Sequence, residues 1–297
     1  MSPPRIAAAA LLLAGLVAGS IGDPPAAHTP LRRGDEIVIT ADFHVHAFLG
    51  DGTFWPWDLV LEGRRQGLDA FAITNHNQTV VARIGRWASQ RLGGPIVLVG
   101  EEITAPRYHL IGVGLKDTVS ARQPAALAIR AVHAQGGVAI AAHPNAAYWA
   151  GFEDEALKEL DGAEVCHPGA YAKAGAMEEF RRFYEHAESL GHHITPIGSS
   201  DFHGPLGAPG LCRTFLFLRE NSEAGILAAL RSGRSVVYAA DGTAYGDPEL
   251  VAWLSSPAGL AARNPPPRDG RAAVSALPGF LGLAGLLLLG PSRTRPT

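Results

Sequence analysis

Cysteine is scarce in this sequence, with only Cys166 and Cys212 among 297 residues. Two cysteines are too few for a disulfide framework, and their number does not indicate a redox compartment. We expect Cys166 to be a small buried residue. Histidine is frequent by comparison, with 12 residues. Any metal chemistry in this protein is therefore expected to use nitrogen and oxygen ligands.

Charged residues are also few, at 18% of the sequence, and the formal net charge is -3. This balance argues against a broad nucleic-acid-binding face, so we expect no stable nucleic-acid complex, whereas a small anionic substrate remains open. Hydrophobic residues make up 47%, which fits a folded protein with some membrane-directed sequence. The length allows one large domain or two small ones.

Both ends of the sequence are apolar. At the start, Arg5 precedes an apolar run from Ile6 to Val17, which is typical of an export signal over residues 1–27, or else of an uncleaved anchor. Near the end, a Pro-rich spacer over 255–271 leads to a run of about 18 apolar residues, just long enough to cross a bilayer. Arg293 and Arg295 follow it, so we predict a C-terminal transmembrane helix within 272–297 whose basic tail is cytoplasmic. The alternative is a buried or processed tail.

These two segments predict an exported protein whose catalytic domain lies on the periplasmic or extracellular face of the cytoplasmic membrane. The domain itself is expected over residues 35–254. Within it, strand-like and helix-like patterns alternate, which indicates an α/β fold with a parallel sheet or barrel covered by helices. The expected strands are Glu36–Asp42, Asp69–Thr74, Pro95–Gly100, Tyr108–Val113, Gly137–Ala142, Gly162–Cys166, Thr195–Gly198 and Thr214–Leu218. The expected helices are Pro56–Arg65, Val80–Arg91, Pro124–Gln135, Glu153–Leu160, Ala172–Leu190 and Ser222–Ser232.

Histidine and acidic residues recur at the ends of the predicted strands. The first strand leads into His44 and His46, which are two residues apart and therefore point to the same face. An isolated pair of this kind would most simply be two polar residues at a strand end. Here further side chains of the same kind accompany the other strands: Asp51, His76, Glu102, His109, His143, Asp201 and His203. Because chemistry collects at the carboxyl ends of strands in such folds, these residues predict a metal site.

Four short motifs in this set resemble those of a known superfamily. They are the His-x-His pair with Asp51-Gly52 after it, the turn from Thr74 to Asn77, the turn Ala142-His143-Pro144, and the run from Gly198 to Gly204. Together they resemble the polymerase and histidinol phosphatase (PHP) superfamily of metallohydrolases over about Glu36 to Leu254. The later segments 213–215 and 226–234 look like its CehA/McbA-like branch.

The resemblance implies a distorted seven-stranded (β/α) barrel that holds two to three divalent ions, Zn, Mn or Fe. It also implies a ligand set for each ion. One ion would lie among His44, His46, Glu102 and Asp201, a second would share Glu102 with His109 and His143, and a third would use Asp51, His76 and His203.

Two further positions bear on this assignment. Adjacent residues of a strand face opposite ways, and the Gly-x-Glu spacing of the family selects Glu102 rather than Glu101. Asn75 stands where the family often has Asp. An asparagine can still form a supporting hydrogen bond but brings no negative charge, so the basicity of His76 is expected to differ.

Divalent ions held close together acidify a water between them and stabilise the charge that develops on a displaced group. We therefore expect a hydrolase of phosphate monoesters or diesters, with a small phosphate ester or nucleotide-like molecule as substrate. A carbamate, ester or amide hydrolase on the same centre is the alternative, and a non-catalytic surface metal-binding protein is a third possibility. His167 is our candidate for the general acid, and Arg107 for a phosphate contact. Tyr148 and Trp149 could stack on a base or an aromatic leaving group.

Overall fold

The structure is a computed structural model that describes residues 3–21, 30–170, 175–204, 206–263, 284–285 and 287. It divides into two units, one formed by 1–28 with 266–297 and the other by 29–265. The first unit contains the helix α1 (Pro3–Ile21), within the predicted signal segment. Most of the predicted anchor over 272–297 lies outside the described residues. In the parts of the chain that the structure describes, no helix has both the length and the apolar character needed to cross a membrane.

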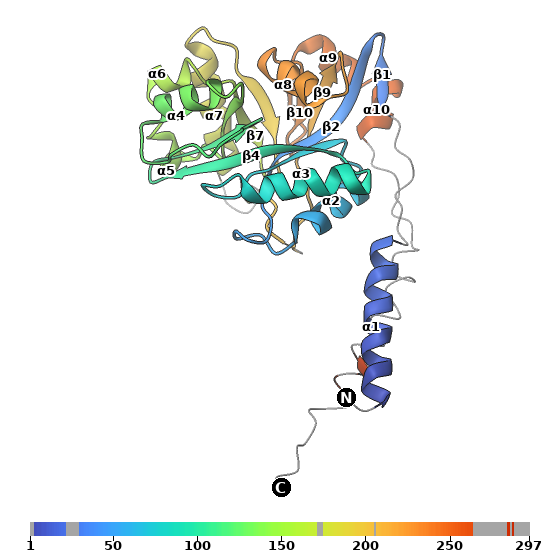
Figure 1. Ribbon diagram of the computed structural model, residues 1–297. Coiled ribbons are helices and arrows are strands. Elements are labelled where there is room, and N and C mark those ends of the chain that lie inside the picture. Colours follow the sequence, from blue (N-terminus) through green and yellow to red (C-terminus); the bar gives the residue numbers. More distant parts are fainter. Residues whose placement is uncertain are drawn as a thin grey trace. The chain divides into compact units, whose positions relative to one another are not determined.

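The second unit is built on one sheet, which has eleven strands among the described residues (Figure 1). The strands are β1 (Leu31–Arg33), β2 (Glu36–Val45), β3 (Ala70–Ile73), β4 (Ile96–Ala105), β5 (Tyr108–Val113), β6 (Val138–Ala141), β7 (Gly162–Cys166), β8 (Thr195–Gly198), β9 (Thr214–Leu218), β10 (Ser235–Tyr238) and β11 (Ala244–Gly246). Their order is β11-β10-β9-β2-β3-β4-β5-β6-β7-β8, with β1 paired to β2.

This sheet nearly closes on itself. The hydroxyl of Ser235 in β10 donates to the carbonyl of Pro196 in β8 at 2.9 Å. The hydroxyl of Thr214 in β9 donates to the carbonyl of Gly198 in β8 at 3.0 Å. The α/β barrel-like architecture expected from the alternating sequence is therefore confirmed.

The finer expectation of a seven-stranded (β/α) barrel needs correction. The pairs β2–β3, β3–β4, β6–β7 and β7–β8 are parallel. In contrast, β5 is antiparallel to both of its neighbours, and β9 is antiparallel to β2 and β10. The turn at Pro106 and Arg107 joins β4 directly to β5, and a tight connection of this kind can only make an antiparallel pair.

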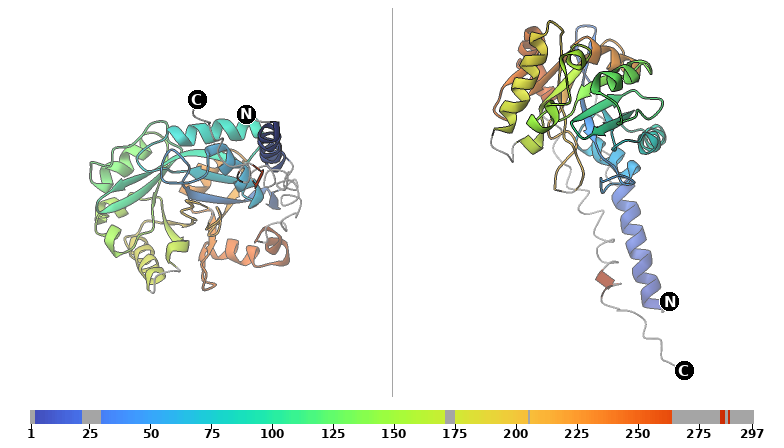
Figure 2. Two further views of the ribbon diagram at one scale, coloured as in Figure 1. Left: turned by 90° about the horizontal axis from the view of Figure 1, so that it is seen from below. Right: turned by 90° about the vertical axis from the view of Figure 1, so that its left-hand side faces the viewer.

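Helices surround the strands (Figures 1 and 2). They are α2 (Pro56–Arg65), α3 (Val80–Leu92), α4 (Ala125–His133), α5 (Ala146–Trp149), α6 (Asp154–Leu157), α7 (Ala176–Ser189), α8 (Glu223–Arg231), α9 (Pro248–Leu254) and α10 (Pro257–Arg263), with a short 3-10 helix at Pro168–Ala170. The last of these, α10, falls inside the range 255–271 that we expected to be a spacer, and it packs on α9. At the other end, β1 pairs with β2 ahead of the expected start at residue 35.

Alternation along the central strands divides the core into two layers. Phe71 and Ile73 of β3 pack in one hydrophobic cluster with residues of α2 and α3 such as Leu59 and Val81. The intervening Ala70 and Ala72 face a second cluster, which includes residues of α8. Successive side chains of β3 point to opposite faces of the sheet, and each face is covered by one of these clusters. Every residue of β3 is therefore buried.

Cys166 and Cys212 form a disulfide, which the cysteine count did not predict. Both residues are buried, as expected for Cys166. The bond joins the last residue of β7 to the segment that precedes β9, so it ties together two parts of the chain whose sequence separation is 46.

The double variant Cys166→Ala/Cys212→Ala should lose about 2–4 kcal/mol of unfolding free energy, because the unfolded chain regains the freedom that this long closed loop removes. Urea unfolding of the variant and the wild-type protein measures the difference. Wild-type protein treated with a reductant serves as the control and should unfold like the variant. Equal stability of the oxidised wild type and the variant would contradict the expectation.

Candidate metal centre

The structure brings all the predicted ligands into one cluster at the ends of the strands. His44 lies in β2 and Glu102 in β4, while His109 lies in β5. The remaining members lie on the connections that follow β2, β3, β6 and β8: His46, Asp51, His76, His143, Asp201 and His203. Their donor atoms form three groups that could each hold a metal ion, and His44 also belongs to a fourth such group with Glu164 and His167. Their role as ligands is a proposal that rests on the geometry below.

The most buried group consists of His44, His46, Glu102 and Asp201. Nε2 of His44 lies 3.3 Å from Oε2 of Glu102 and 3.1 Å from Oδ1 of Asp201. Nε2 of His46 lies 3.3 Å and 3.2 Å from the same two oxygens. In a tetrahedral site with metal–ligand distances of about 2.0 Å, the ligand atoms lie about 3.3 Å apart. These four distances between histidine nitrogens and carboxylate oxygens are close to that value.

These atoms also lack other partners. Nε2 of His44, Nε2 of His46 and Oε2 of Glu102 are buried and form no hydrogen bond with any described residue. An unpaired buried polar atom is costly, so a convergent set of them calls for an explanation. A divalent cation at their common centre satisfies all of them at once, and the side chains present fit such an ion.

Glu102 connects this group with a second one. Its Oε1 lies 2.6 Å from Nδ1 of His109 and 3.1 Å from Nε2 of His143. The two oxygens of one carboxylate therefore face different ligand groups, as expected for a bridging residue. Glu101 points to the other side of β4, where its Oε2 accepts a hydrogen bond from the amide of Val119 at 2.9 Å.

The third group is centred on Asp51 and is more exposed. Oδ2 of Asp51 lies 3.0 Å from Nε2 of His76 and 3.0 Å from Nε2 of His203. Its Oδ1 lies 2.9 Å from Nδ1 of His46. His46 thus faces the buried group with one ring nitrogen and Asp51 with the other, which links the first group to the third.

The cluster has an unusual charge balance. Burial opposes a positive charge on His46, but the carboxylates around it, Asp201 foremost, outweigh burial and raise the pKa of His46 to about 10. Burial likewise opposes a negative charge on Glu102, yet the histidines beside it, first among them His44, lower its pKa well below the usual value. The carboxylates of the cluster thus stabilise positive charge beside them. Divalent cations bound to neutral histidines supply it without protons.

Two buried carboxylates that we did not predict form hydrogen bonds with residues of the cluster. Glu164 in β7 places Oε1 2.8 Å from Nδ1 of His44, and its Oε2 accepts a hydrogen bond from the amide of His143 at 2.6 Å. A carboxylate in this position orients the imidazole and raises its basicity as a ligand. The available signal was a lone acidic residue inside the otherwise uncharged strand Gly162–Cys166.

Asp42 is the second supporting carboxylate. It accepts hydrogen bonds from the amides of His44, Ser200 and Gly210 and from the hydroxyl of Ser200. Burial raises the pKa of Asp42, although these donors act in the opposite direction. By fixing β2 to the turn after β8, Asp42 sets the position of His44 relative to Asp201.

Backbone strain is concentrated around the cluster. Among the described residues, the non-glycine residues with positive φ are Leu49, Asn77, His143 and Asp201. Such conformations cost free energy and persist where the surrounding structure enforces them, typically at functional sites. Gly52 adds a close approach, because a Cβ there would lie 2.4 Å from the carbonyl of His46.

A cavity of about 370 Å³ opens at the cluster, and its lining includes His167 and Tyr148. His167 follows β7, and its Nε2 lies 3.3 Å from Oδ2 of Asp201. The ring of Tyr148 stacks on that of His109 with centroids 4.0 Å apart. Trp149 instead packs edge-on against the ring of Phe183, away from the described lining of the cavity.

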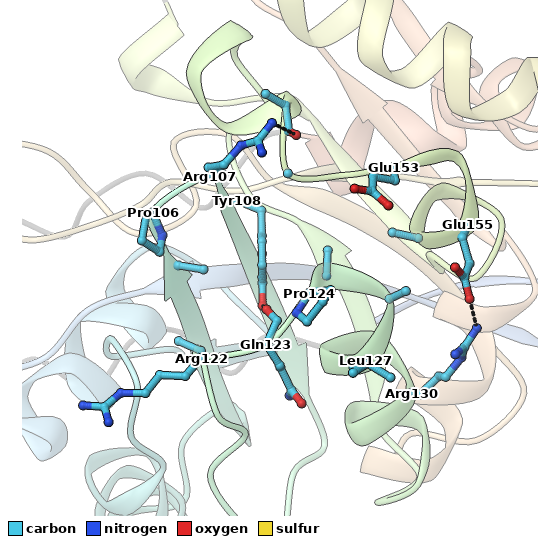
Figure 3. A pocket seen from close by; sticks show the side chains of 17 residues that line it. Pro106, Arg107, Tyr108, Arg122, Gln123, Pro124, Leu127, Arg130, Glu153 and Glu155 are labelled. Carbon is cyan, nitrogen blue, oxygen red and sulfur yellow. Dashed lines mark hydrogen bonds and ion pairs between the residues drawn. The ribbon is translucent and has the colours of Figure 1, made fainter.

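Arg107 does not line this cavity, so the structure does not support its predicted contact with a phosphate at the metal centre. It lies on the turn between β4 and β5, and its guanidinium donates to the carbonyl of Ala150 at 2.8 Å. There it lines a second cavity of about 660 Å³, whose opposite side carries Arg130 paired with Glu155 (Figure 3).

Asn75 also has a different role from the one we expected. Its side-chain oxygen accepts from the amide of Ala47 at 3.1 Å, and its amide nitrogen donates to the carbonyl of Ala47 at 2.7 Å. An amide side chain can do both, whereas an ionised carboxylate has no donor. Asn75 therefore holds the backbone after His46 in place.

No protein-family model matches the sequence. An uncharacterized protein of Methanocaldococcus jannaschii is 29% identical over 149 residues, which cover 46% of this chain and 85% of that protein. A solved structure from Bacteroides vulgatus, described as a two-domain protein containing a predicted PHP-like metal-dependent phosphoesterase, has a TM-score of 0.59 and 24% identity over 76% of this chain and 72% of its own. A structure from Bifidobacterium adolescentis, described as a candidate metal-dependent phosphoesterase, has a TM-score of 0.46 and 20% identity over 58% of this chain and 91% of its own. The Bacteroides structure shows that this chain shares the fold of that protein.

The variant Glu164→Gln should bind divalent metal about 10–100-fold more weakly than the wild-type protein. A glutamine has one acceptor oxygen, so it cannot accept from both the His44 ring and the His143 amide. Calorimetric titration of the metal-free protein with Mn²⁺ or Zn²⁺ measures the affinity. Glu101→Gln is the matched control, because this buried glutamate accepts from Val119 and, among the described residues, contacts none of the predicted ligands by a hydrogen bond. It should keep wild-type affinity. Unchanged affinity in Glu164→Gln would show that the carboxylate does not support the centre.

Proposed function

We propose that this protein is a metal-dependent hydrolase of the PHP type that acts on phosphate esters. The observation that carries the proposal is the Glu102 carboxylate, whose oxygens face two different groups of histidine and aspartate donors at 2.6–3.3 Å. The fold shared with a PHP-like protein supports it. Membership of the CehA/McbA-like branch stays a prediction.

Divalent ions bound at such side chains supply a Lewis acid and an activated water for hydrolysis. The protein's own residues hold and orient these ions. Glu102 would be shared between two of them, and Asp51 would contribute to the third. Glu164 fixes the ring of His44, and Asp42 holds the backbone that carries His44 close to the turn that carries Asp201. The cavity beside them admits the ester group.

His167 is proposed to donate a proton to the leaving group. Its Nδ1 accepts a hydrogen bond from the amide of Gly169 at 3.0 Å, so a neutral ring carries its hydrogen on Nε2. That nitrogen is buried, has no hydrogen-bond partner among the described residues, and lies beside Asp201 at the cavity. His167 also lies in a possible ligand group with His44 and Glu164. In that group Nδ1 of His44 and Oε1 of Glu164 already pair with each other at 2.8 Å, so we assign His167 to proton transfer rather than to metal binding.

Hydrolysis of a carbamate, ester or amide is the second candidate. It is favoured by the lining of the cavity, which includes no lysine or arginine among the described residues. A phosphate would have to be neutralised there by the ions and histidines alone, whereas an uncharged carbonyl group would not need further cations.

We also propose that the domain works outside the cytoplasm. The Cys166–Cys212 disulfide supports this location, because disulfides persist mainly in oxidising compartments. The apolar helix α1 is consistent with an export signal. Anchoring through residues 272–297 rests on their sequence alone.

The proposed function is tested on the purified chain by elemental analysis and by assays of phosphate release from phosphomonoesters and phosphodiesters. We expect two to three ions per chain and phosphate release that a chelator abolishes. Glu102→Ala should lower both metal content and activity, the latter roughly 100-fold or more, since it removes a ligand from two groups at once.

Glu101→Gln again provides the control and should retain metal and activity. Bound metal without phosphate release, but with release of an alcohol or amine from a carbamate or ester, would favour the second candidate. Wild-type metal content in Glu102→Ala would contradict the assignment of the centre.

A further inference from the structure

The disulfide between Cys166 and Cys212 lies at the end of β7, directly before His167, the residue proposed to assist the leaving group. Earlier in the same strand, Glu164 faces the metal centre, where its Oε1 lies 2.8 Å from the ring of a predicted ligand. His167 faces the same centre, with Nε2 3.3 Å from Oδ2 of Asp201. Side chains of a regular strand that are three positions apart point to opposite faces. The direction of His167 therefore needs a local irregularity in the chain.

A bulge in β7 provides this irregularity. The register of β7 against β8 shifts by one residue between Glu164 and Cys166. A bulge changes the alternation of side chains by one position, and bulges beside active sites commonly redirect a side chain in this way. Glu164 and His167 can therefore both face the metal centre. The two residues between them pack in a separate apolar cluster together with Cys212.

The other half of the disulfide lies on a segment that is fixed to the metal centre. Two residues before Cys212, the amide of Gly210 donates to Oδ2 of Asp42 at 2.6 Å. Asp42 also accepts a hydrogen bond from the amide of Ser200 at 3.1 Å, directly before a predicted metal ligand. The disulfide therefore joins the backbone before His167 to the same carboxylate that holds the turn after β8.

Outside the ligand cluster, the contacts of the His167 ring with the described residues are local or weak. Its Nδ1 accepts a hydrogen bond from the amide of Gly169 at 3.0 Å, within the same turn. The ring of Phe180 in α7 packs edge-on against it with centroids 6.0 Å apart. The backbone before His167 is joined to the turn after β8 by the amide of Ser199, which donates to the carbonyl of Cys166 at 3.1 Å. The disulfide adds a covalent link at the same position, which restricts the chain more than these contacts do.

We propose that the Cys166–Cys212 disulfide is a positioning element for catalysis, because it holds the bulge that directs His167 toward the leaving group. This inference rests on the proposed function and on the role assigned there to His167. Loss of the bond frees the end of β7 from the segment held by Asp42. The ring of His167 then moves away from the leaving oxygen, although the predicted metal ligands stay in place. A misplacement of about 1 Å in a contact of this kind can cost about 100-fold in rate.

The test compares methyl phosphate, which has a poor leaving group, with 4-nitrophenyl phosphate, whose leaving group is stable as an anion and needs little assistance. In Cys166→Ala/Cys212→Ala, kcat on methyl phosphate should fall roughly 10–100-fold, while kcat on 4-nitrophenyl phosphate should fall less than about threefold. Metal content, measured by elemental analysis, should stay at the wild-type value. A general loss of structure or of metal would lower both rates together.

Leu254→Ala is the matched control for lost stability. Leu254 is fully buried in α9 but lies in a different apolar cluster, with Val38 and Phe217. This variant should unfold at a lower urea concentration, as the disulfide variant does, and should leave the ratio of the two rates unchanged. His167→Asn should show the selective loss on methyl phosphate. Removal of the disulfide from His167→Asn should add no further selective loss, because both changes act through the same ring.

A measurement without turnover separates this inference from the proposed function. In hydrogen exchange followed by NMR, the Ser199 amide should exchange faster in the double variant, because it donates to the carbonyl of Cys166. The amide of Thr195, which donates to the carbonyl of Asp161 at the start of β8, is the internal reference for global unfolding. If the wild type hydrolyses neither ester but this local effect is present, the proposed function fails while the disulfide still holds the end of β7.

An equal loss on both esters overturns the proposal, and so does a selective loss that disulfide removal still causes in His167→Asn. Unchanged protection of the Ser199 amide overturns it as well. If the double variant does not fold, Cys212→Ala breaks the same bond and keeps the side chain of Cys166. Folded wild-type protein treated with a phosphine reductant gives the same comparison without any substitution.

Discussion

The structure depends on bringing buried carboxylates and imidazoles together without leaving their charges unbalanced. Glu102 is the central member, because its two oxygens face two separate groups of donors. Isolated buried charges are far too costly to persist, so such a cluster is stable only with compensating positive charge. Protonated histidines or bound cations can supply it. Cations also satisfy the buried nitrogens of His44 and His46 that have no hydrogen-bond partner among the described residues.

The near-closed sheet makes this arrangement possible. Donors from three strands and four connections meet only when β8 approaches β9 and β10, which brings Asp201 to the end of β2. Two carboxylates then hold these donors in position. Asp42 holds the backbone after β8, and Glu164 holds the ring of His44. Both oxygens of each carboxylate have a hydrogen-bond partner, so neither residue could be replaced by an apolar one without leaving donors unpaired. The strained backbone at His143 fits the same account, because Glu164 accepts from its amide.

Much of this could be predicted from the sequence, for a local reason. The bounds of α2, β7, β8 and β9 match the predicted ranges because short apolar runs flanked by polar residues identify buried elements. Most ligand candidates were identified because they follow such a run, whereas His109 opens one and Asp51 lies on a loop. We expected these candidates to lie together because functional residues collect at the carboxyl ends of strands in such folds. The sequence did not show any contact between them. The fold class was predictable for the same reason.

What could not be predicted depends on contacts between distant segments. The Cys166–Cys212 bond joins segments whose proximity depends on closure of the sheet. The sequence did not single out Glu164, because its hydrogen bond to His44 depends on how β7 packs beside the cluster. The sequence also placed Arg107 at the centre, whereas in the structure Arg107 lines the second cavity. A sequence pattern therefore identifies the residues able to bind metal, whereas the groups that orient them, such as Glu164 and Asp42, emerge only from the packed chain.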